Sequence, residues 1–379
     1  MQTCMLFEFS FCTLRNLRYF CKPSISFAIS SCISVKNISR GFGTTNIPLS
    51  TVILRQTTPY CSPQTPTFTY HTANPRTNVM ENIEKLGQVL DGKLIAGDIQ
   101  KNITQQVTEL REQSNVVPGL AIVQVGDRSD SNVYIRMKTK TAAEVGINAQ
   151  HVRLGSDTSE KELLQKIDEL NADPAVHGII LQLPLDCKNP INASKATDAI
   201  SAQKDVDGLT TMNAGHLARG ELKSCTIPCT PRGCLELIKR SGVKIEGSRA
   251  VVLGRSKIVG SPMAELLIWH HATVTVCHSK TVDLPAVIRE ADILVVAIGK
   301  AKFVQSSWIK PGAVVIDCGI NVIPDSSLKS GQRIVGDVDY AAAKDTASFI
   351  TPVPGGVGPM TVAMLLQNTL ESAQKSSKL

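Results

Sequence analysis

Short apolar runs alternate with helix-patterned segments between residues 94 and 182, and this alternation constrains the fold more than any other feature. The apolar runs have the length of strands, and the segments between them carry apolar residues at helical spacing. Strand–helix–strand order predicts a parallel sheet with helices on both faces. We expect helices over 94–113, 131–145 and 160–170, and strands over 120–125, 149–154 and 178–182.

A strand, a glycine turn and a helix follow one another after residue 250. In Rossmann proteins the backbone N–H groups of such a turn, and of the following helix N-terminus, bind a pyrophosphate. This turn departs from G-x-G-x-x-G, because Ser256 stands at the second glycine and Gly260 comes one residue late. Dinucleotide binding therefore stays open on this motif alone. Further strands are expected over 272–277, 293–298 and 313–318.

The end of the next strand indicates which dinucleotide would bind. NAD enzymes place an acid there, about 20 residues after the glycine turn, to hold the ribose hydroxyls. Here the strand ends in Cys277-His278-Ser279-Lys280, which contains no acid. Arg255, Ser279 and Lys280 could instead hold a 2′-phosphate. The charges therefore favour NADP over NAD.

An aromatic ring and an amine are placed to act together after the first strand. Tyr134 and Lys138 are four residues apart, so on a helix they share one face. Gln182 ends an apolar strand, where α/β sheets bind ligands, and a buried amide needs hydrogen-bond partners. A partly desolvated lysine can transfer protons near neutral pH. The alternative is an exposed lysine beside a half-buried tyrosine.

Two loops complete the set of candidate site segments. Asp205 and Asp207 precede Gly208; the calcium ligands of an EF-hand are missing, and the alternative role is a capping acid in a turn. Residues 351–361 hold prolines and glycines that make a stiff loop whose backbone can approach a ligand. We expect the last helix to begin with Pro359 in its first position. The alternative for this loop is a simple connector.

Composition and charge exclude several classes of protein. The formal net charge is +7, and most of it lies in the first 80 residues, where Glu8 is the only acid. The nearly neutral remainder argues against nucleic-acid binding. No run approaches the length of a membrane span. Cys225, Cys229 and Cys234 lack the spacing of a zinc site, so we expect no bound metal.

The two ends of the chain carry competing targeting signals. Residues 1–78 are rich in serine and threonine and hold scattered arginines, which is typical of an organelle transit peptide. We expect a mitochondrial location, with a plastid as the alternative. The last residues are Ser377-Lys378-Leu379, a peroxisomal signal. A cytosolic location follows if the leader has no targeting role.

Five motifs, in this order, resemble those of the bifunctional methylenetetrahydrofolate dehydrogenase/methenyltetrahydrofolate cyclohydrolase family. The resemblance covers about residues 85–375 and is strongest to the dehydrogenase/cyclohydrolase portion of C1-tetrahydrofolate synthases. The motifs are Tyr134-x-x-x-Lys138, Leu181-Gln182-Leu183-Pro184, Lys204-Asp205-Val206-Asp207-Gly208, residues 254–260, and residues 352–361.

The resemblance implies an α/β fold of two α/β domains with a cleft between them, the second a Rossmann-like NADP-binding domain. It implies NADP-dependent oxidation of 5,10-methylenetetrahydrofolate, hydrolysis to 10-formyltetrahydrofolate, and a homodimer. We expect a folate-binding catalytic domain over 79–228, the NADP-binding domain over 229–350, and a loop and helix over 351–379 that pack back on the first domain.

The resemblance also implies a role for each matched residue. Lys138 would transfer protons, Gln182 would hold Lys138 and tune its pKa, Tyr134 would pack on the aminobenzoate ring, and Asp207 would bind the pterin. The nucleotide would contact Gly254, Arg255, Ser256 and Ser279. The folate would also contact Leu181, Leu183, Pro354, Gly355, Gly356, Val357, Gly358, Pro359, Met360, Thr361 and Val362.

Two other functions stay open from sequence alone. One is a folate-binding or regulatory subunit without catalysis, and the other is a dehydrogenase that lacks cyclohydrolase activity. Because Tyr134, Lys138, Gln182 and Asp207 are all present, the sequence favours the enzyme.

Overall fold

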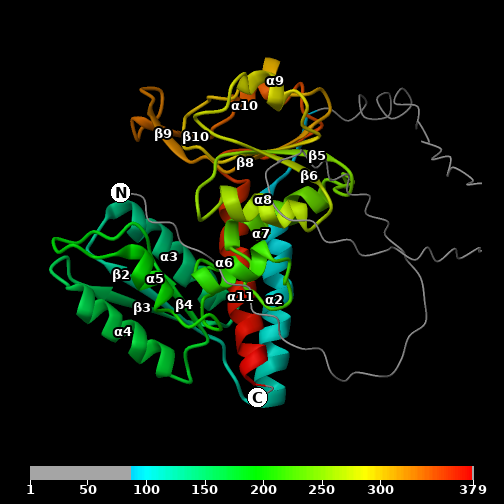
Figure 1. Cartoon of the computed structure of the whole chain (residues 1–379). Helices are drawn as coiled ribbons and strands as arrows, with labels where there is room; N and C mark the ends of the chain where they lie inside the picture. Colours follow the sequence, from blue (N-terminus) through cyan, green and yellow to red (C-terminus); the bar gives the residue numbers. More distant parts are fainter. Residues whose placement is uncertain (1–86, 378–379) are drawn as a thin grey trace, which may run out of the picture. The chain divides into compact units, whose positions relative to one another are not determined.

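The computed structural model describes residues 87–377 (Figure 1). The predicted transit peptide and the last two residues of the predicted peroxisomal signal lie outside the described residues.

The first sheet is parallel and has three strands in the order β3-β2-β4. All seven residues of the central strand β2 are buried. Its two faces pack against different helices: Leu120 and Ile122 join a core with α2 (Gly92–Ser114) and α3, whereas Ala121 and Val123 join one with α4 and α5. This confirms the predicted parallel sheet with helices on both faces. The elements are β2 (Gly119–Val125), α3 (Ser129–Glu144), β3 (Asn148–Leu154), α4 (Glu160–Ala172), β4 (Gly178–Leu181), α5 (Ala193–Asp198) and α6 (Thr211–Ala218).

The second sheet has six strands in the order β1-β11-β8-β7-β5-β6, and every neighbouring pair is parallel. The crossover helices between its strands give the Rossmann-like order that the glycine turn predicted. A separate antiparallel hairpin, β9–β10, follows β8. The elements are β1 (Gln88–Val89), β5 (Arg249–Leu253), α8 (Gly260–Ile268), β6 (Thr273–Cys277), α9 (Leu284–Ile288), β7 (Ile293–Val296), the 3-10 turn η1 (Ser306–Trp308), β8 (Val314–Asp317), β9 (Asn321–Pro324), β10 (Gln332–Val335), α10 (Tyr340–Ala343) and β11 (Phe349–Ile350).

Three helices connect the two sheets through one continuous apolar core. The long helices α2 (Gly92–Ser114) and α11 (Val357–Ser376) lie side by side, and α7 (Cys229–Arg240) packs on α11 (Figure 1). Their buried side chains form one cluster with residues from both sheets, such as Ile122 of β2 and Val252 of β5. The sheet edges that carry the site residues are therefore held by a common support. The predicted domain boundaries stay a prediction.

The last helix begins two residues before the predicted start. Its first residue is Val357, so Pro359 occupies the third helical position and not the first. The N–H groups of a first helical turn have no acceptor within the helix, so a proline costs no hydrogen bond at this position either.

The start of α2 lies directly against the glycine-rich loop before α11. Lys93 N–H donates to Gly355 O at 3.1 Å, and a Cβ on Gly92 would lie 1.8 Å from Gly356 O. Gly355 has φ +111°, which few residues other than glycine adopt. Glycine at these positions therefore lets the helix and the loop touch backbone to backbone.

We predict that Gly92→Ala lowers the free energy of unfolding by about 1–3 kcal/mol, because the new methyl group must push the helix and the loop apart. Gly97→Ala is the matched control in the same helix, since a Cβ there meets nothing within 4 Å. The control should be neutral or stabilising by up to about 1 kcal/mol. Equal midpoints of urea unfolding for the two variants would contradict this view of the contact.

Candidate active site

The amine of Lys138 is held by the amide of Gln182. Lys138 lies on α3, and its Nζ donates to Gln182 Oε1 at 3.0 Å. Gln182 follows β4 directly, where its backbone N–H donates to Val123 O and its Nε2 donates to Leu183 O at 3.0 Å. The side-chain amide therefore has its donor and acceptor ends fixed. The structure brings these two predicted residues together from segments 44 positions apart.

Tyr134 lies one turn before Lys138 on α3, as the spacing predicted. Tyr134 is 37% exposed, so part of the residue is free to contact another molecule. The helix thus presents an aromatic surface next to a tethered amine. Leu181 is buried in the sheet, and Leu183 lines a cavity of about 430 Å³ together with Gly208 and residues of α5, α6 and α8.

The two acids of the 204–208 loop have different surroundings. Asp205 is 1% exposed, and its carboxylate accepts the N–H groups of Gly208 and Thr210, each at 2.8 Å. It is the structural, turn-capping acid that the alternative reading described. Gly208 has φ +70°, and a Cβ there would lie 2.6 Å from Thr226 O. The other acid, Asp207, lies near enough to Lys138 for the two charges to interact.

The charge of Lys138 acts on Asp207. Burial raises the pKa of the Asp207 carboxyl, and the nearby Lys138 ammonium opposes that rise. The thiol of Cys229 is also adjacent: burial and the Asp207 carboxylate raise the pKa of Cys229 well above its usual value. Lys138, Asp207 and Cys229 therefore form one electrostatic group. Sequence reasoning considered Cys229 only as part of a possible zinc site and did not assign it to this group.

The 352–362 segment divides into an accessible part and a core part. Pro354 is exposed, and Gly355, Gly358, Pro359 and Thr361 are partly exposed. In contrast, Gly356 is buried. Three further residues are buried within the apolar core: Val357, Met360 and Val362. The contact of all nine residues with folate stays a prediction, and for the core residues the side chains are already used in packing.

A cavity of about 290 Å³ opens at the carboxyl ends of β5, β6 and β7. It brings together three predicted cofactor residues, Gly254, Arg255 and Ser279, and adds His278 and Lys300. Gly254 has φ +121°, and a Cβ there would lie 2.2 Å from Ala297 O, so only glycine fits this turn. A glycine turn at a strand end, with the cations Arg255 and Lys300 in the same cavity, suits a dinucleotide. Ser256 is different, because its Oγ accepts the N–H groups of Val259 and Gly260 at 3.2 and 3.3 Å.

Two buried aspartates that sequence reasoning missed hold loops at the carboxyl ends of these strands, a region called the cofactor edge below. Asp337 accepts the N–H groups of Ile298, Gly299 and Lys300 at 2.7–2.9 Å and so fixes the loop that carries Lys300. Asp317 accepts the N–H groups of three residues at 2.9–3.0 Å: Gly319, Asp337 and Val338. Burial raises the pKa of Asp317 to about 6 even though these hydrogen bonds lower it. In the sequence, Asp337 directly follows Gly336 and Asp317 lies two residues before Gly319, which is a weak signal.

Among residues 87–377, no three or more histidine, cysteine, aspartate or glutamate side chains are grouped to hold a metal ion. In that same stretch, no helix combines the length and apolar character that a membrane crossing requires.

A tethered amine near one sheet and a glycine turn of the dinucleotide-binding type on the other are the features expected of an α/β dehydrogenase. Family comparison agrees: residues 90–207 match the tetrahydrofolate dehydrogenase/cyclohydrolase catalytic domain, and residues 228–377 match the NAD(P)-binding domain of that family. The chain belongs to the tetrahydrofolate dehydrogenase/cyclohydrolase family. The predicted family and the two-part α/β fold, with an NAD(P)-binding second part, are thereby confirmed.

Individual relatives give the same family. The chain is 58% identical over 291 residues to the cytoplasmic C-1-tetrahydrofolate synthase of Rattus norvegicus, covering 76% of this chain but only 31% of that protein. It is 50% identical to the chloroplastic bifunctional protein FolD 4 of Arabidopsis thaliana, covering 76% and 79% of the two chains. A Trypanosoma brucei dehydrogenase-cyclohydrolase, solved with NADP and an inhibitor, superposes with a TM-score of 0.74 at 41% identity, covering 78% and 99%.

Proposed function

We propose that this site oxidises 5,10-methylenetetrahydrofolate to the methenyl cation and then adds water to give 10-formyltetrahydrofolate. The observation that carries the proposal is the Lys138 Nζ–Gln182 Oε1 hydrogen bond beside Asp207. Hydride transfer needs little from the protein beyond placement, whereas ring opening needs a group that moves a proton. The site offers one amine held in a fixed place for that task.

Each site residue near the three-stranded sheet has a distinct role in this proposal. NADP, held by the residues named below, would supply the hydride acceptor. Lys138 takes the proton from the water that attacks the methenyl carbon, and Gln182 keeps the amine oriented. A cationic substrate next to Lys138 favours the neutral amine, because like charges disfavour the ammonium form. Tyr134 stacks on the aminobenzoate ring, and Asp207 accepts hydrogen bonds from the pterin.

On the cofactor side, the backbone of Gly254–Ser256 holds the pyrophosphate, and Arg255 with Ser279 holds the 2′-phosphate. The support is that Gly254, Arg255 and Ser279 line one cavity, together with Lys300. No acid lines that cavity to bind a free ribose hydroxyl.

Lys138→Ala is expected to lower the rate of ring opening by about 100-fold or more, because the proton acceptor is lost. Dehydrogenase activity should fall less, because hydride transfer requires placement of the two reactants. Lys140→Ala is the matched control on the same helix, with a side chain that is 78% exposed. Both rates follow from the absorbance of the methenyl product. A normal yield of 10-formyl product from the Lys138 variant would refute the role, and a wild type with no methenyl formation would favour a non-catalytic subunit.

Arg255→Ala is expected to raise the Kd for NADP about tenfold or more, because charge-assisted hydrogen bonds to the 2′-phosphate are lost. The Kd for NAD should change much less. Arg249→Ala serves as the control, since Arg249 lies at the amino end of β5 and pairs with Glu290. Titration calorimetry with both nucleotides separates the outcomes, and equal losses for the two would contradict 2′-phosphate recognition.

We also propose a homodimer. The β9–β10 hairpin leaves a directly paired couple of apolar side chains exposed, Val322 at 58% and Ile334 at 44%. Ile320 beside them is 50% exposed, which makes a patch that a second copy of the chain could cover.

Val322→Lys is expected to halve the mass measured by light scattering, because a buried unpaired charge opposes association. Val282→Lys is the matched control at an isolated side chain that is 88% exposed. A wild type that is already monomeric would contradict the homodimer, and an unchanged dimer in the Val322 variant would place the interface elsewhere.

For the compartment, we propose import into mitochondria through residues 1–78, on the composition of that segment. Cytoplasmic and chloroplastic forms both occur among its relatives. A fluorescent protein fused to each terminus in turn masks one candidate signal at a time, and peroxisomal or plastid fluorescence would replace this proposal.

A further inference from the structure

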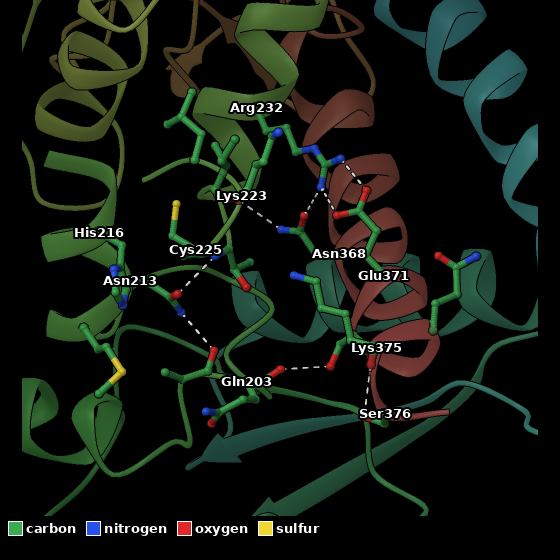
Figure 2. A pocket seen from close by; sticks show the side chains of 18 residues that line it. Gln203, Asn213, His216, Lys223, Cys225, Arg232, Asn368, Glu371, Lys375 and Ser376 are labelled. Atoms are coloured by element: carbon green, nitrogen blue, oxygen red, sulfur yellow. Dashed lines mark hydrogen bonds and ion pairs between the residues drawn. The ribbon is translucent and has the colours of Figure 1, made fainter. Parts of the chain in front are cut away.

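A further cavity, of about 710 Å³, has Asn213, Arg232 and Asn368 among its lining residues (Figure 2). It is lined by α6, α7, α11 and the two connecting loops around residues 202 and 225, and none of the residues proposed above to bind folate or NADP line it. Asn368 of α11 lies at its base and is only 4% exposed. Such a buried amide needs partners for both its donors and its acceptor.

Asn368 satisfies all of these groups by joining two loops. Its Nδ2 donates to Val206 O at 2.8 Å and to Ile227 O at 3.0 Å. Its Oδ1 accepts a hydrogen bond from Arg232 Nη1. Only one orientation of the amide makes this set of bonds, because a flipped amide would aim its oxygen at two carbonyl oxygens. Asn368 is therefore a clamp between the 205–210 loop and the 226–229 segment.

Arg232, which donates to Asn368, also forms an ion pair with Glu371 (Figure 2). Arg232 donates to both oxygens of Glu371, through Nη1 at 2.9 Å and Nη2 at 2.6 Å. Gln367 Nε2 adds a bond to Glu371 at 3.0 Å. Burial raises the pKa of Glu371, but the hydrogen bonds and charge of Arg232 outweigh it and leave that pKa lowered. The guanidinium thus keeps a fixed charged partner while it orients Asn368.

The two clamped loops carry groups of the site itself. Val206 is the residue before Asp207, and its carbonyl oxygen also accepts a hydrogen bond from Cys229 Sγ at 3.2 Å. Ile227 lies two residues before Cys229. We propose that Asn368, oriented by the Arg232–Glu371 pair, is a positioning residue that fixes the Asp207 carboxylate relative to the Lys138 amine. The inference rests on the proposed role of Asp207 in binding the folate.

Asn368→Asp tests this with almost no change in shape, because it sets a carboxylate oxygen against the carbonyls of Val206 and Ile227. We expect the KM for 5,10-methylenetetrahydrofolate to rise about tenfold or more, since two buried carbonyls lose their donor. The KM for NADP should stay within about twofold, because the cofactor edge is untouched. The pH profile of kcat should shift, since the environment of Asp207 changes. A purely structural loss would lower the active fraction and leave both KM values and the profile unchanged.

Gln374→Glu is the matched control, an amide-to-acid change on the same helix and in the same cavity. Gln374 bonds Gln106 of α2, not the Asp207 loop, so wild-type kinetics are expected. If Asn368→Asp does not fold, Glu371→Gln tests the inference instead. This variant keeps an acceptor for Arg232 but removes the charge of the ion pair. We expect it to raise the KM for 5,10-methylenetetrahydrofolate, by less than the rise expected for Asn368→Asp.

Crystal structures of the wild type and of the Asn368→Asp variant show the position of the Asp207 carboxylate directly, which is a readout that does not depend on activity. The inference is overturned if the folded variant keeps Asp207 in place with wild-type folate kinetics, or if Glu371→Gln is the only folded variant and changes nothing. A wild type without activity would overturn the proposed function alone, and a displaced Asp207 carboxylate in the variant would still support the positioning role.

Discussion

One hydrogen bond, from Lys138 Nζ to Gln182 Oε1, connects a helix to the end of a buried strand and turns a mobile side chain into a fixed one. A lysine side chain loses considerable rotamer freedom when it is held in one place, so the partner must itself be rigid. Gln182 is rigid because its backbone pairs with β2 and its Nε2 is bonded to the next residue. The strength of the site therefore derives from the sheet, and α3 needs only to bring the amine within reach.

Buried polar side chains repeatedly act as scaffolding for loops in this protein. Asp205 gathers N–H groups around one turn, Asp337 gathers three in succession, and Asn368 spans two segments. A buried acceptor without donors would be costly, so each loop can adopt only the conformation that satisfies its anchor. The loops at the ligand edges are thereby shaped before any substrate arrives.

The parts of the fold that could be predicted from sequence are those with a strong periodic signal. The strands after residue 119 and the helices between them follow apolar spacing, and the Tyr134–Lys138 geometry follows from helical repeat alone. The start of α11 was misplaced, because glycine and proline near a helix end are compatible with several starting positions.

The roles of Asp337 and Asn368 could not be predicted, since they depend on partners 37 to 162 positions away along the chain. Their residue types are also those of ordinary surface positions. Likewise, nothing in the 352–362 segment distinguishes the accessible Pro354 from the core residue Met360, because packing against α7 decides that difference.

The pairing of β1 with β11 has a consequence for the order of assembly. Gln88 and Val89 lie beside Phe349 and Ile350, so the edge of the six-stranded sheet is made from segments synthesised far apart in time. During translation, which proceeds at about 5–20 residues per second, the early strand must wait tens of seconds for its neighbour. The three-stranded sheet has no such delay, since all its strands lie between residues 119 and 181. Folding of this chain during synthesis would thus begin with the three-stranded sheet and end with the six-stranded sheet.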